Sequence, residues 1–312
     1  MAEDDTSSSE HAAPDTRCSF IAVIGAPNAG KSTLVNQLVG TKVSIVSRKV
    51  QTTRIPVRGI VIQGKSQLVF LDTPGIFRPR RRLDRAMVEA AWAGALDADA
   101  VVLLVDAVKG IDEDVERVLQ RLSDSKSAKV LVLNKVDRLH DKKSLLDLAQ
   151  NLTQRIAFDR VFMVSALDGS GTEDLKVYLG ETAPPGPWHY PEDEVSDLSE
   201  RKLAAEITRE KIYERLHDEL PYALTVETTD WKNHKDGSAR VEQTIFVERE
   251  SQRMIVLGKG GATIKQISMD ARTELGRLLD HPVHLFLFVK VRESWADDPE
   301  RYREMGLEFP KE

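Results

Sequence analysis

The chain has 312 residues, 41% of them hydrophobic, with a formal net charge of −6 and one cysteine. This length allows about two domains, the single cysteine excludes an internal disulfide framework, and no apolar run approaches the roughly 18 residues of a membrane-spanning helix. Residues 1–17 are acidic and have neither the basic nor the apolar part of a signal peptide, so we expect a disordered tail there.

The first predicted strand, 20–24, is followed by Gly25–Ser32, which matches the phosphate-binding pattern G-x-x-x-x-G-K-[ST]. A helix with apolar residues at helical spacing follows and ends at Gly40. Strand, glycine-rich turn and helix N-terminus direct backbone N–H groups at a phosphate. Lys31 is expected at the β- and γ-phosphates and the Ser32 hydroxyl on Mg²⁺. The expected phosphate-site residues are Asn28, Ala29, Gly30, Lys31, Ser32 and Thr33.

A second motif, Asp72-Thr73-Pro74-Gly75, follows the predicted strand 67–71. Asp72 then lies at the carboxyl end of a strand, facing the metal site, and the Gly75 N–H is directed at the γ-phosphate. We therefore assign Asp72, Thr73, Pro74 and Gly75 to the nucleotide site.

The identity of the bound nucleotide base is predicted by Asn134–Asp137, which follows the strand-like run 130–133. Guanine presents two adjacent donors that the Asp137 carboxylate accepts as a fork, while Asn134 ties the loop and the Lys135 stem covers the base. Adenine lacks this donor pair and would leave the carboxylate unpaired. The alternative is an ordinary polar turn.

A fourth motif, Ser165-Ala166-Leu167, ends the predicted strand 161–164 and offers backbone N–H groups to guanine O6. All four motifs follow predicted strands, and open α/β sheets bind ligands at those ends. The run 100–105 reads as a further buried parallel strand. We therefore expect residues 18–180 to form a GTP-binding α/β domain with a doubly wound, mostly parallel sheet.

An acidic, proline-rich stretch with no basic residue follows and is predicted to be a linker over 181–198. Beyond it, residues 199–305 read as a smaller α+β domain: helix 199–218, strands 222–229 and 241–248, helix 251–256, helix 261–277 and strand 283–291. We expect a C-terminal tail over 306–312.

Between the last two helices lies Gly258-Lys259-Gly260-Gly261. Two helices joined by a G-x-x-G turn on a small sheet form the KH arrangement, whose turn clamps about four nucleotides. Ile267 is expected to share in the apolar wall for the bases alongside core packing. The alternative for Gly258 is that it caps a helix. The candidate RNA-binding residues are Ile255, Leu257, Gly258, Lys259, Gly260, Gly261, Ile264 and Lys265.

The two predicted domains together resemble the bacterial Era family of GTPases over residues 18–305. Besides the motifs above, the resemblance includes Gln51–Arg54, Glu219–Tyr222, Val247–Glu250 and Trp295–Asp298. It implies a type II KH domain, GTP hydrolysis with Mg²⁺, binding to the 3′ end of small-subunit ribosomal RNA and a part in assembly of the 30S subunit. It further implies a cytoplasmic monomer with peripheral association with the inner membrane.

Catalysis is expected to involve Lys31, Thr53 and Gly75. Ile76 stands where a Ras-type enzyme has a water-orienting glutamine, and an isoleucine side chain has no group to orient water. Related GTPases with an asparagine at the position of Asn28 resemble enzymes that bind K⁺ beside the phosphates; the alternative is that Asn28 only favours the turn.

Switch I is expected between Val43 and Pro56, and either Thr52 or Thr53 ligates Mg²⁺ there. Related GTPases favour Thr53, so the metal ligands we name are Ser32, Thr53 and Asp72. Switch II, from Gly75 to about Met87, carries five arginines, at 78, 80, 81, 82 and 85. They form either a solvated run or a surface for RNA phosphate or the neighbouring domain.

Two classes of function remain open from these residues. The chain is either an RNA-binding switch or a GTPase whose second domain docks on a protein or membrane, and a docking domain does not need a G-x-x-G turn. A tRNA-modifying GTPase is disfavoured because the C-terminal part contains no cysteine-rich motif.

Overall fold

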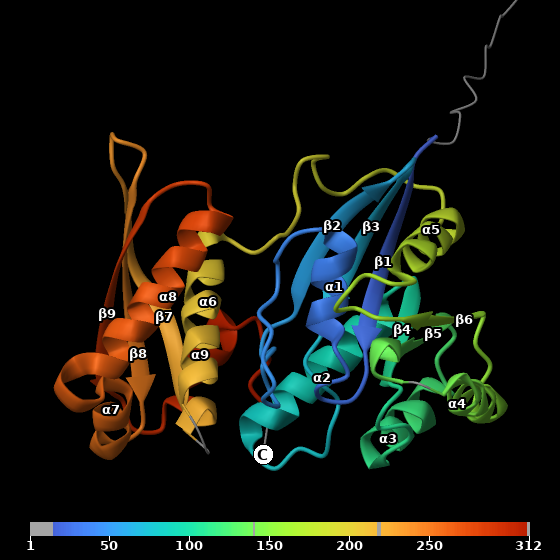
Figure 1. The fold of residues 1–312 in the computed structure, drawn as a ribbon, viewed down its shortest axis with the longest axis horizontal. Coiled ribbons are helices and arrows are strands. Elements are labelled where there is room, and N and C mark those ends of the chain that lie inside the picture. The colour runs from blue at the N-terminus through green and yellow to red at the C-terminus, as the bar shows by residue number, and fades with distance from the viewer. Residues whose placement is uncertain (1–14, 140, 217–219, 311–312) are drawn as a thin grey trace, which may run out of the picture.

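The computed structural model describes residues 15–139, 141–216 and 220–310, which form two sheets, each with its own helices (Figure 1). Of the expected N-terminal tail, residues 1–14 lie outside the described residues. Glu219 and residues 311–312 also lie outside them. Within the described part, the first strand already begins at Arg17.

The first sheet has six strands in the order β2-β3-β1-β4-β5-β6. They are β1 (Arg17–Ile24), β2 (Val57–Gln63), β3 (Ser66–Asp72), β4 (Ala100–Asp106), β5 (Ala128–Asn134) and β6 (Arg160–Val164). All neighbours pair in parallel except β2 and β3, which are antiparallel. The strand β2 was not among the predicted elements, and only Gly64 and Lys65 join it to β3. So short a connection permits only antiparallel pairing.

Helices cover both faces of this sheet (Figure 1). On one face, α1 (Lys31–Val39) and α5 (Thr172–Thr182) share a core with the strands, and on the other α2 (Arg82–Asp97), α3 (Glu113–Leu122) and α4 (Lys142–Arg155) do so. The chain leaves β1 between β3 and β4, where the strand order reverses. This reversal opens a crevice at the carboxyl ends of the strands, where the phosphate-binding turn lies.

The second sheet has the order β7-β8-β9, with β7 (Leu224–Asn233) antiparallel to β8 (Ala239–Val247) and β8 parallel to β9 (Val283–Val291). Two helices, α6 (Glu200–Arg215) and α8 (Ala262–Leu278), pack on it through buried apolar residues. The helix α7 (Glu250–Leu257) precedes α8, and α9 (Pro299–Glu304) follows the sheet. The helix predicted over 199–218 corresponds to α6, which ends earlier, at Arg215. Residues 217–218 lie outside the described residues.

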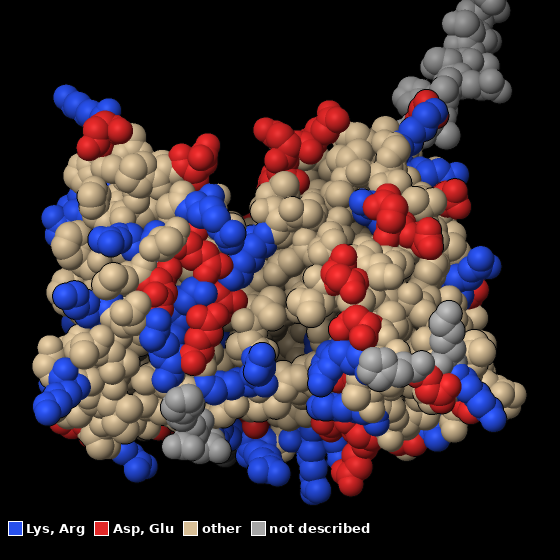
Figure 2. Space-filling view, in the orientation of Figure 1, with Lys and Arg blue, Asp and Glu red and all other residues tan. Residues whose placement is uncertain are grey.

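The two halves touch along α6, which faces the loop between α1 and β2 (Figure 1). Acidic and basic side chains alternate along this junction (Figure 2). Lys42 of the loop pairs with Glu210 of α6 and Glu274 of α8. The predicted linker is tied to the first sheet, because Asp197 pairs with Arg58 at 2.7 Å and Tyr190 O accepts a hydrogen bond from Gln67 at 2.8 Å.

Residues 306–310 of the predicted C-terminal tail pack against the rest of the protein. Leu307 is buried against Tyr302 and Trp295, together with Leu83 and Met87 of α2. An apolar patch on α2 requires a cover, and the chain end supplies it. Residues 306–310 thus join the second half to the first.

Candidate nucleotide and RNA sites

The phosphate-binding turn has the shape that the motif predicts. Gly30 adopts φ 102°, and a Cβ there would lie 2.4 Å from the Asn134 amide nitrogen, so only glycine fits. The Lys31 ammonium donates to the carbonyls of Gly25 and Ala26 at 3.2 and 3.1 Å. Burial lowers the pKa of Lys31 to about 8, while the nearby Asp72 acts in the opposite direction. Lys31, Ser32, Thr33 and Gly75 line one cavity.

Three oxygen-bearing side chains meet beside this turn. Ser32 Oγ lies 2.7 Å from Asp72 Oδ2 and 2.9 Å from Thr53 Oγ1, and Thr53 Oγ1 lies 3.4 Å from the same carboxylate oxygen. Asp72 Oδ1 is buried and has no partner among the described residues. Burial raises the pKa of Asp72, and the Ser32 hydrogen bond opposes this.

Thr52 lies apart from this cluster. Its hydroxyl contacts Ser47 Oγ at 2.5 Å and donates to Lys49 O at 2.8 Å, within switch I itself. Of the two adjacent threonines that the sequence left open, the structure brings Thr53 to Ser32 and Asp72.

The base-recognition loop is tied to the phosphate turn. Asn134 donates to Ala29 O at 2.8 Å and accepts from the Ala166 N–H at 2.9 Å. Lys135 spans the turn, with its ammonium 2.6 Å from Asn28 O and 2.7 Å from Asp106 Oδ2. Asp137 is exposed in a short 3-10 helix, Val136–Arg138, with its carboxylate accessible to a base.

Two of the expected backbone donors are engaged within the protein. The Ser165 N–H donates to Ser170 O, and the Ala166 N–H donates to Asn134 Oδ1. Leu167 is 79% exposed. In this structure the Ser165 and Ala166 N–H groups therefore brace the loop. Thr73 and the buried Pro74 likewise shape the Asp72 loop, since the Thr73 hydroxyl donates to Val23 O at 2.8 Å.

The residue after Thr53 enters the other half of the molecule. Arg54 is 2% exposed, and its guanidinium donates to Leu224 O at 2.7 Å and to Pro221 O and Tyr213 Oη at 3.1 Å each. The sequence motif Gln51–Arg54 had predicted no role for Arg54. Its position next to Thr53, the expected metal ligand, was a usable signal, because successive side chains of an extended segment point to opposite sides.

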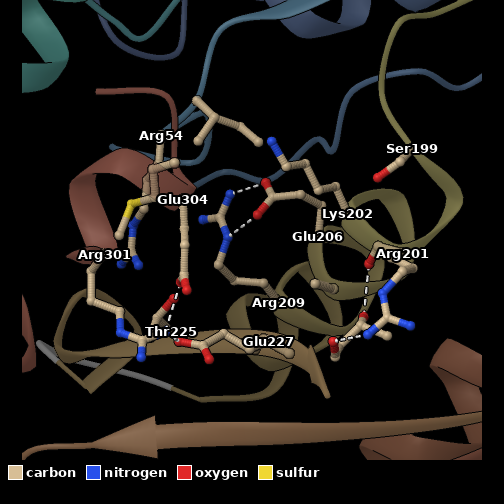
Figure 3. Close-up of a pocket in the computed structure, with 15 residues that line it drawn as sticks. Arg54, Ser199, Arg201, Lys202, Glu206, Arg209, Thr225, Glu227, Arg301 and Glu304 are labelled. Carbon is tan, nitrogen blue, oxygen red and sulfur yellow. Dashed lines mark hydrogen bonds and ion pairs between the residues drawn. The ribbon is translucent and has the colours of Figure 1, made fainter. Parts of the chain in front are cut away.

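A cavity of about 320 Å³ lies at this contact, between switch I, α6 and α9 (Figure 3). Arg209 of α6 is paired with Glu206 and donates to Thr52 O at 2.6 Å, and Arg301 of α9 is paired with Glu227 and Glu304 (Figure 3). The Val46 N–H of switch I donates to Glu210 at 2.7 Å. Switch I is therefore bonded to α6 at Arg209, Glu210 and Tyr213.

The G-x-x-G turn joins α7 to α8 as predicted. Gly258, Gly260 and Gly261 all have positive φ angles, and a Cβ on Gly258 would lie 2.1 Å from Thr263 Oγ1. Lys259, Gly260 and Lys265 are exposed, Ile255 is 55% exposed, and Leu257 and Ile264 are half-buried beside them. The turn thus presents a basic tip and an apolar flank. Ile267 does not reach this flank, because it is fully buried in the core under α6. Its expected core packing is therefore confirmed, and its expected place in the wall was wrong.

Fold and site together define the class: a P-loop GTP-binding domain followed by a KH domain. The sequence matches the family described as "50S ribosome-binding GTPase" over residues 20–135 and the KH domain family over 219–296. No helix of the described residues has the length and apolarity to cross a membrane.

Curated relatives match along almost the whole chain. GTPase Era of Brucella suis biovar 1 is 63% identical, covering 96% of each chain, and GTPase Era of Sinorhizobium medicae is 61% identical, covering all of both. Two solved Era structures share 35% identity and cover 93% of this chain and 99% of their own. One is an Aquifex aeolicus Era variant bound to GDP·AlF4⁻, with a TM-score of 0.89. The other is Era in complex with MgGDPNP and nucleotides 1506–1542 of 16S ribosomal RNA, with a TM-score of 0.88. The chain belongs to the Era family of GTPases and is a GTP-hydrolysing enzyme.

Proposed function

We propose that this GTPase is a nucleotide-dependent switch that binds the 3′ end of 16S ribosomal RNA through its KH turn and acts in assembly of the small subunit. The relative that was solved with nucleotides 1506–1542 of that RNA supports the choice of ligand. The description of the broader family names the 50S subunit but covers only residues 20–135, without the KH turn. The RNA complex covers both halves and is the better guide.

One observation supports the proposal of a nucleotide-dependent switch. Thr53, beside the expected metal site, is directly followed by Arg54, which is buried in the KH half. A nucleotide affects RNA affinity only if the two nucleotide states differ in an arrangement that RNA also prefers. Closure of switch I over the phosphates provides that arrangement.

The residues present fit Mg²⁺. The cluster offers two hydroxyls and a carboxylate whose Oδ1 has no hydrogen-bond partner among the described residues. Mg²⁺ takes oxygen ligands from few protein groups together with substrate phosphates. Ser32, Thr53 and Asp72 would hold the ion, which neutralises charge on the phosphates when bound. Lys31 and the turn's N–H groups hold the β- and γ-phosphates, and the Gly75 N–H faces the γ-phosphate. Asp137 selects guanine by accepting its N1–H and amino group.

The water that attacks GTP receives no help from residue 76. Ile76 is 2% exposed and lies in the core with Ala91 and Trp92. We infer that a K⁺ ion at Asn28 supplies the positive charge that an arginine finger provides in other GTPases. The Asn28 amide lies between the phosphate turn and switch I, 3.2 Å from Arg48 O. Its φ of 62° gives asparagine a second, purely conformational reason to stand there.

The test is to measure the affinity for the 1506–1542 fragment with the protein loaded with a GTP analogue or with GDP. We expect tighter binding in the GTP-analogue state by about 1–3 kcal/mol, the usual range of such coupling. Lys259→Ala with Gly260→Asp should abolish RNA binding and leave basal hydrolysis intact. Equal affinities in the two states would refute the switch.

The alternative is that the second half docks on a protein or membrane. Binding of single-stranded RNA that depends on the KH turn would exclude it. A cytoplasmic location, a monomeric state, binding to the whole 30S subunit and peripheral membrane association rest on the family resemblance alone.

A further inference from the structure

The cavity of about 320 Å³ between switch I, α6 and α9 has walls from both halves of the molecule. Switch I contributes Arg54 and Ile55. Figure 3 shows Arg54 and Arg301 on one side of the cavity and Lys202 and Arg209 of α6 on the other. The volume is at the lower end of the roughly 300–1,000 Å³ that is usual for small-molecule sites. The phosphate turn has a separate cavity, so this one is not part of the nucleotide site.

Three buried guanidinium nitrogens of the lining side chains have no hydrogen-bond acceptor among the described residues. They are Arg54 Nε, Arg209 Nη1 and Arg301 Nε. Buried donors are nearly always paired with protein, with water or with an ion. The same signal, an unpaired buried oxygen, marks Asp72 at the expected Mg²⁺ site. Three unpaired donors around one cavity therefore indicate an acceptor that the protein itself does not supply.

The cavity also carries an excess of positive charge, because five basic and three acidic side chains line it. The three carboxylates are already held by arginines. Glu206 is held by Arg209. Glu227 and Glu304 are both held by Arg301. The acidic side chains are thus neutralised within the lining and leave the other basic groups without a counter-charge.

Among the residues that the structure describes, the remaining three basic side chains have no carboxylate within ion-pair distance; they are Arg54, Arg201 and Lys202. Arg201 and Lys202 are exposed, but Arg54 is 2% exposed, and its acceptors are carbonyl and hydroxyl oxygens. Burial lowers the pKa of Arg54, and so does the neighbouring Arg209 cation. A buried charge is costly unless a counter-charge compensates it.

We propose that this cavity binds a small anion with a terminal phosphate group, held by Lys202 and by the unpaired N–H groups of Arg54 and Arg209. A phosphate group offers several acceptor oxygens and carries about two negative charges at neutral pH, which matches the unpaired donors and the excess charge. Ile55 and Val226 give the lining an apolar part that suits a small organic group. An anion bound between switch I and α6 stabilises this arrangement of the two halves. The inference does not depend on RNA binding.

Calorimetric titration of inorganic phosphate into the full chain tests the site. The protein is loaded with Mg²⁺ and a non-hydrolysable GTP analogue, so that the phosphate turn is filled, and chloride keeps the ionic strength constant. We expect saturable binding of one phosphate per chain. Lys202→Ala should weaken it at least about tenfold, because a charge-assisted hydrogen bond is lost. Lys202→Arg keeps the charge and should stay within about threefold of the unchanged protein.

The matched control is Lys235→Ala, at an exposed lysine in the turn between β7 and β8. It should bind phosphate as the unchanged protein does. A second titration, with glycerol 3-phosphate, separates the two sources of a terminal phosphate. Tighter binding than inorganic phosphate identifies a phosphomonoester as the ligand, and equal or weaker binding identifies inorganic phosphate.

Three outcomes would overturn the proposal. If neither phosphate compound binds saturably to the unchanged protein, water alone fills the cavity. If Lys202→Ala binds phosphate as the unchanged protein does, or loses no more affinity than Lys235→Ala, the phosphate binds elsewhere. If Lys202→Ala instead weakens binding of the 1506–1542 RNA fragment in phosphate-free buffer, the lysine serves RNA and the small-anion site is wrong.

Discussion

Thr53 and Arg54 are neighbours in the chain, yet their side chains enter different halves of the molecule. Thr53 Oγ1 lies 2.9 Å from Ser32 Oγ at the start of α1, and the Arg54 guanidinium lies 2.7 Å from Leu224 O at the start of β7. A single peptide unit therefore joins the expected metal site to the KH half. Movement of switch I away from Ser32 would have to disturb the contacts of Arg54.

We predict that Arg54→Ala uncouples nucleotide from RNA. Without the guanidinium, switch I loses its buried hydrogen bonds to the KH half. The ratio of RNA affinities between the GTP-analogue and GDP states should therefore fall to less than about twofold. Fluorescence anisotropy with the 1506–1542 fragment measures both affinities. Arg58→Ala removes an exposed pair with Asp197 and serves as the control that keeps the ratio. An unchanged ratio in Arg54→Ala would show that coupling runs elsewhere.

The two adjacent threonines should differ sharply on substitution. Thr53→Ala removes a hydroxyl from the Ser32–Asp72 cluster, so it should raise the Mg²⁺ concentration needed for half-maximal GTP hydrolysis and lower kcat at least about tenfold. Thr52→Ala loses only contacts within switch I and should stay within about threefold. Mg²⁺ titrations of the steady-state rate compare them. Loss of activity in Thr52→Ala alone would reverse the assignment.

Nucleotide binding should take up a proton at alkaline pH. Burial lowers the pKa of Lys31 to about 8, and a bound triphosphate raises it again by favouring the charged ammonium. GTP affinity should therefore be flat below about pH 8 and fall by up to about tenfold per pH unit above it. Calorimetry at pH 8.5 in two buffers of different ionisation enthalpy measures the uptake. Lys31→Arg, which stays charged, should show none, and equal uptake in both proteins would assign the proton to another group.

The lowered pKa of Lys31 also makes the stability of the nucleotide-free protein depend on pH. Because the pKa of Lys31 is lower in the folded state than its ordinary value of 10.5, charging it opposes folding. Lys31 should therefore add to the free energy of unfolding as the pH rises from about 8 to 10.5, and lose that contribution as the pH falls through 8.

Hydrolysis should be faster in K⁺ than in Na⁺ at equal ionic strength. The reason is the inferred cation at Asn28, in a site where Ile76 offers no group to orient water. Asn28→Gly tolerates the left-handed backbone at this position and removes only the side-chain amide, so it should abolish the difference between the two salts. Equal rates in K⁺ and Na⁺ for the unchanged protein would remove the idea.

The sequence by itself determined the chemistry that depends on neighbouring residues. A phosphate turn is built from consecutive positions, so Gly25–Ser32 predicted a strand, a turn and a helix in their observed order. The same holds for Asp72 and Asn134 at the ends of β3 and β5, and for Gly258–Gly261 between two helices. Local spacing defines such motifs because the backbone itself supplies the ligand contacts.

Tertiary structure decided what depends on residues far apart in the chain. The position of Thr53 beside Ser32 and Asp72, the burial of Arg54 in the KH half and the packing of Leu307 on α2 all arise from contacts between distant segments. Ile267 faces the core for the same reason, since helical periodicity marks an apolar residue without saying which partner covers it. A sequence pattern reports that a side chain needs a partner, and only the assembled fold brings that partner within reach.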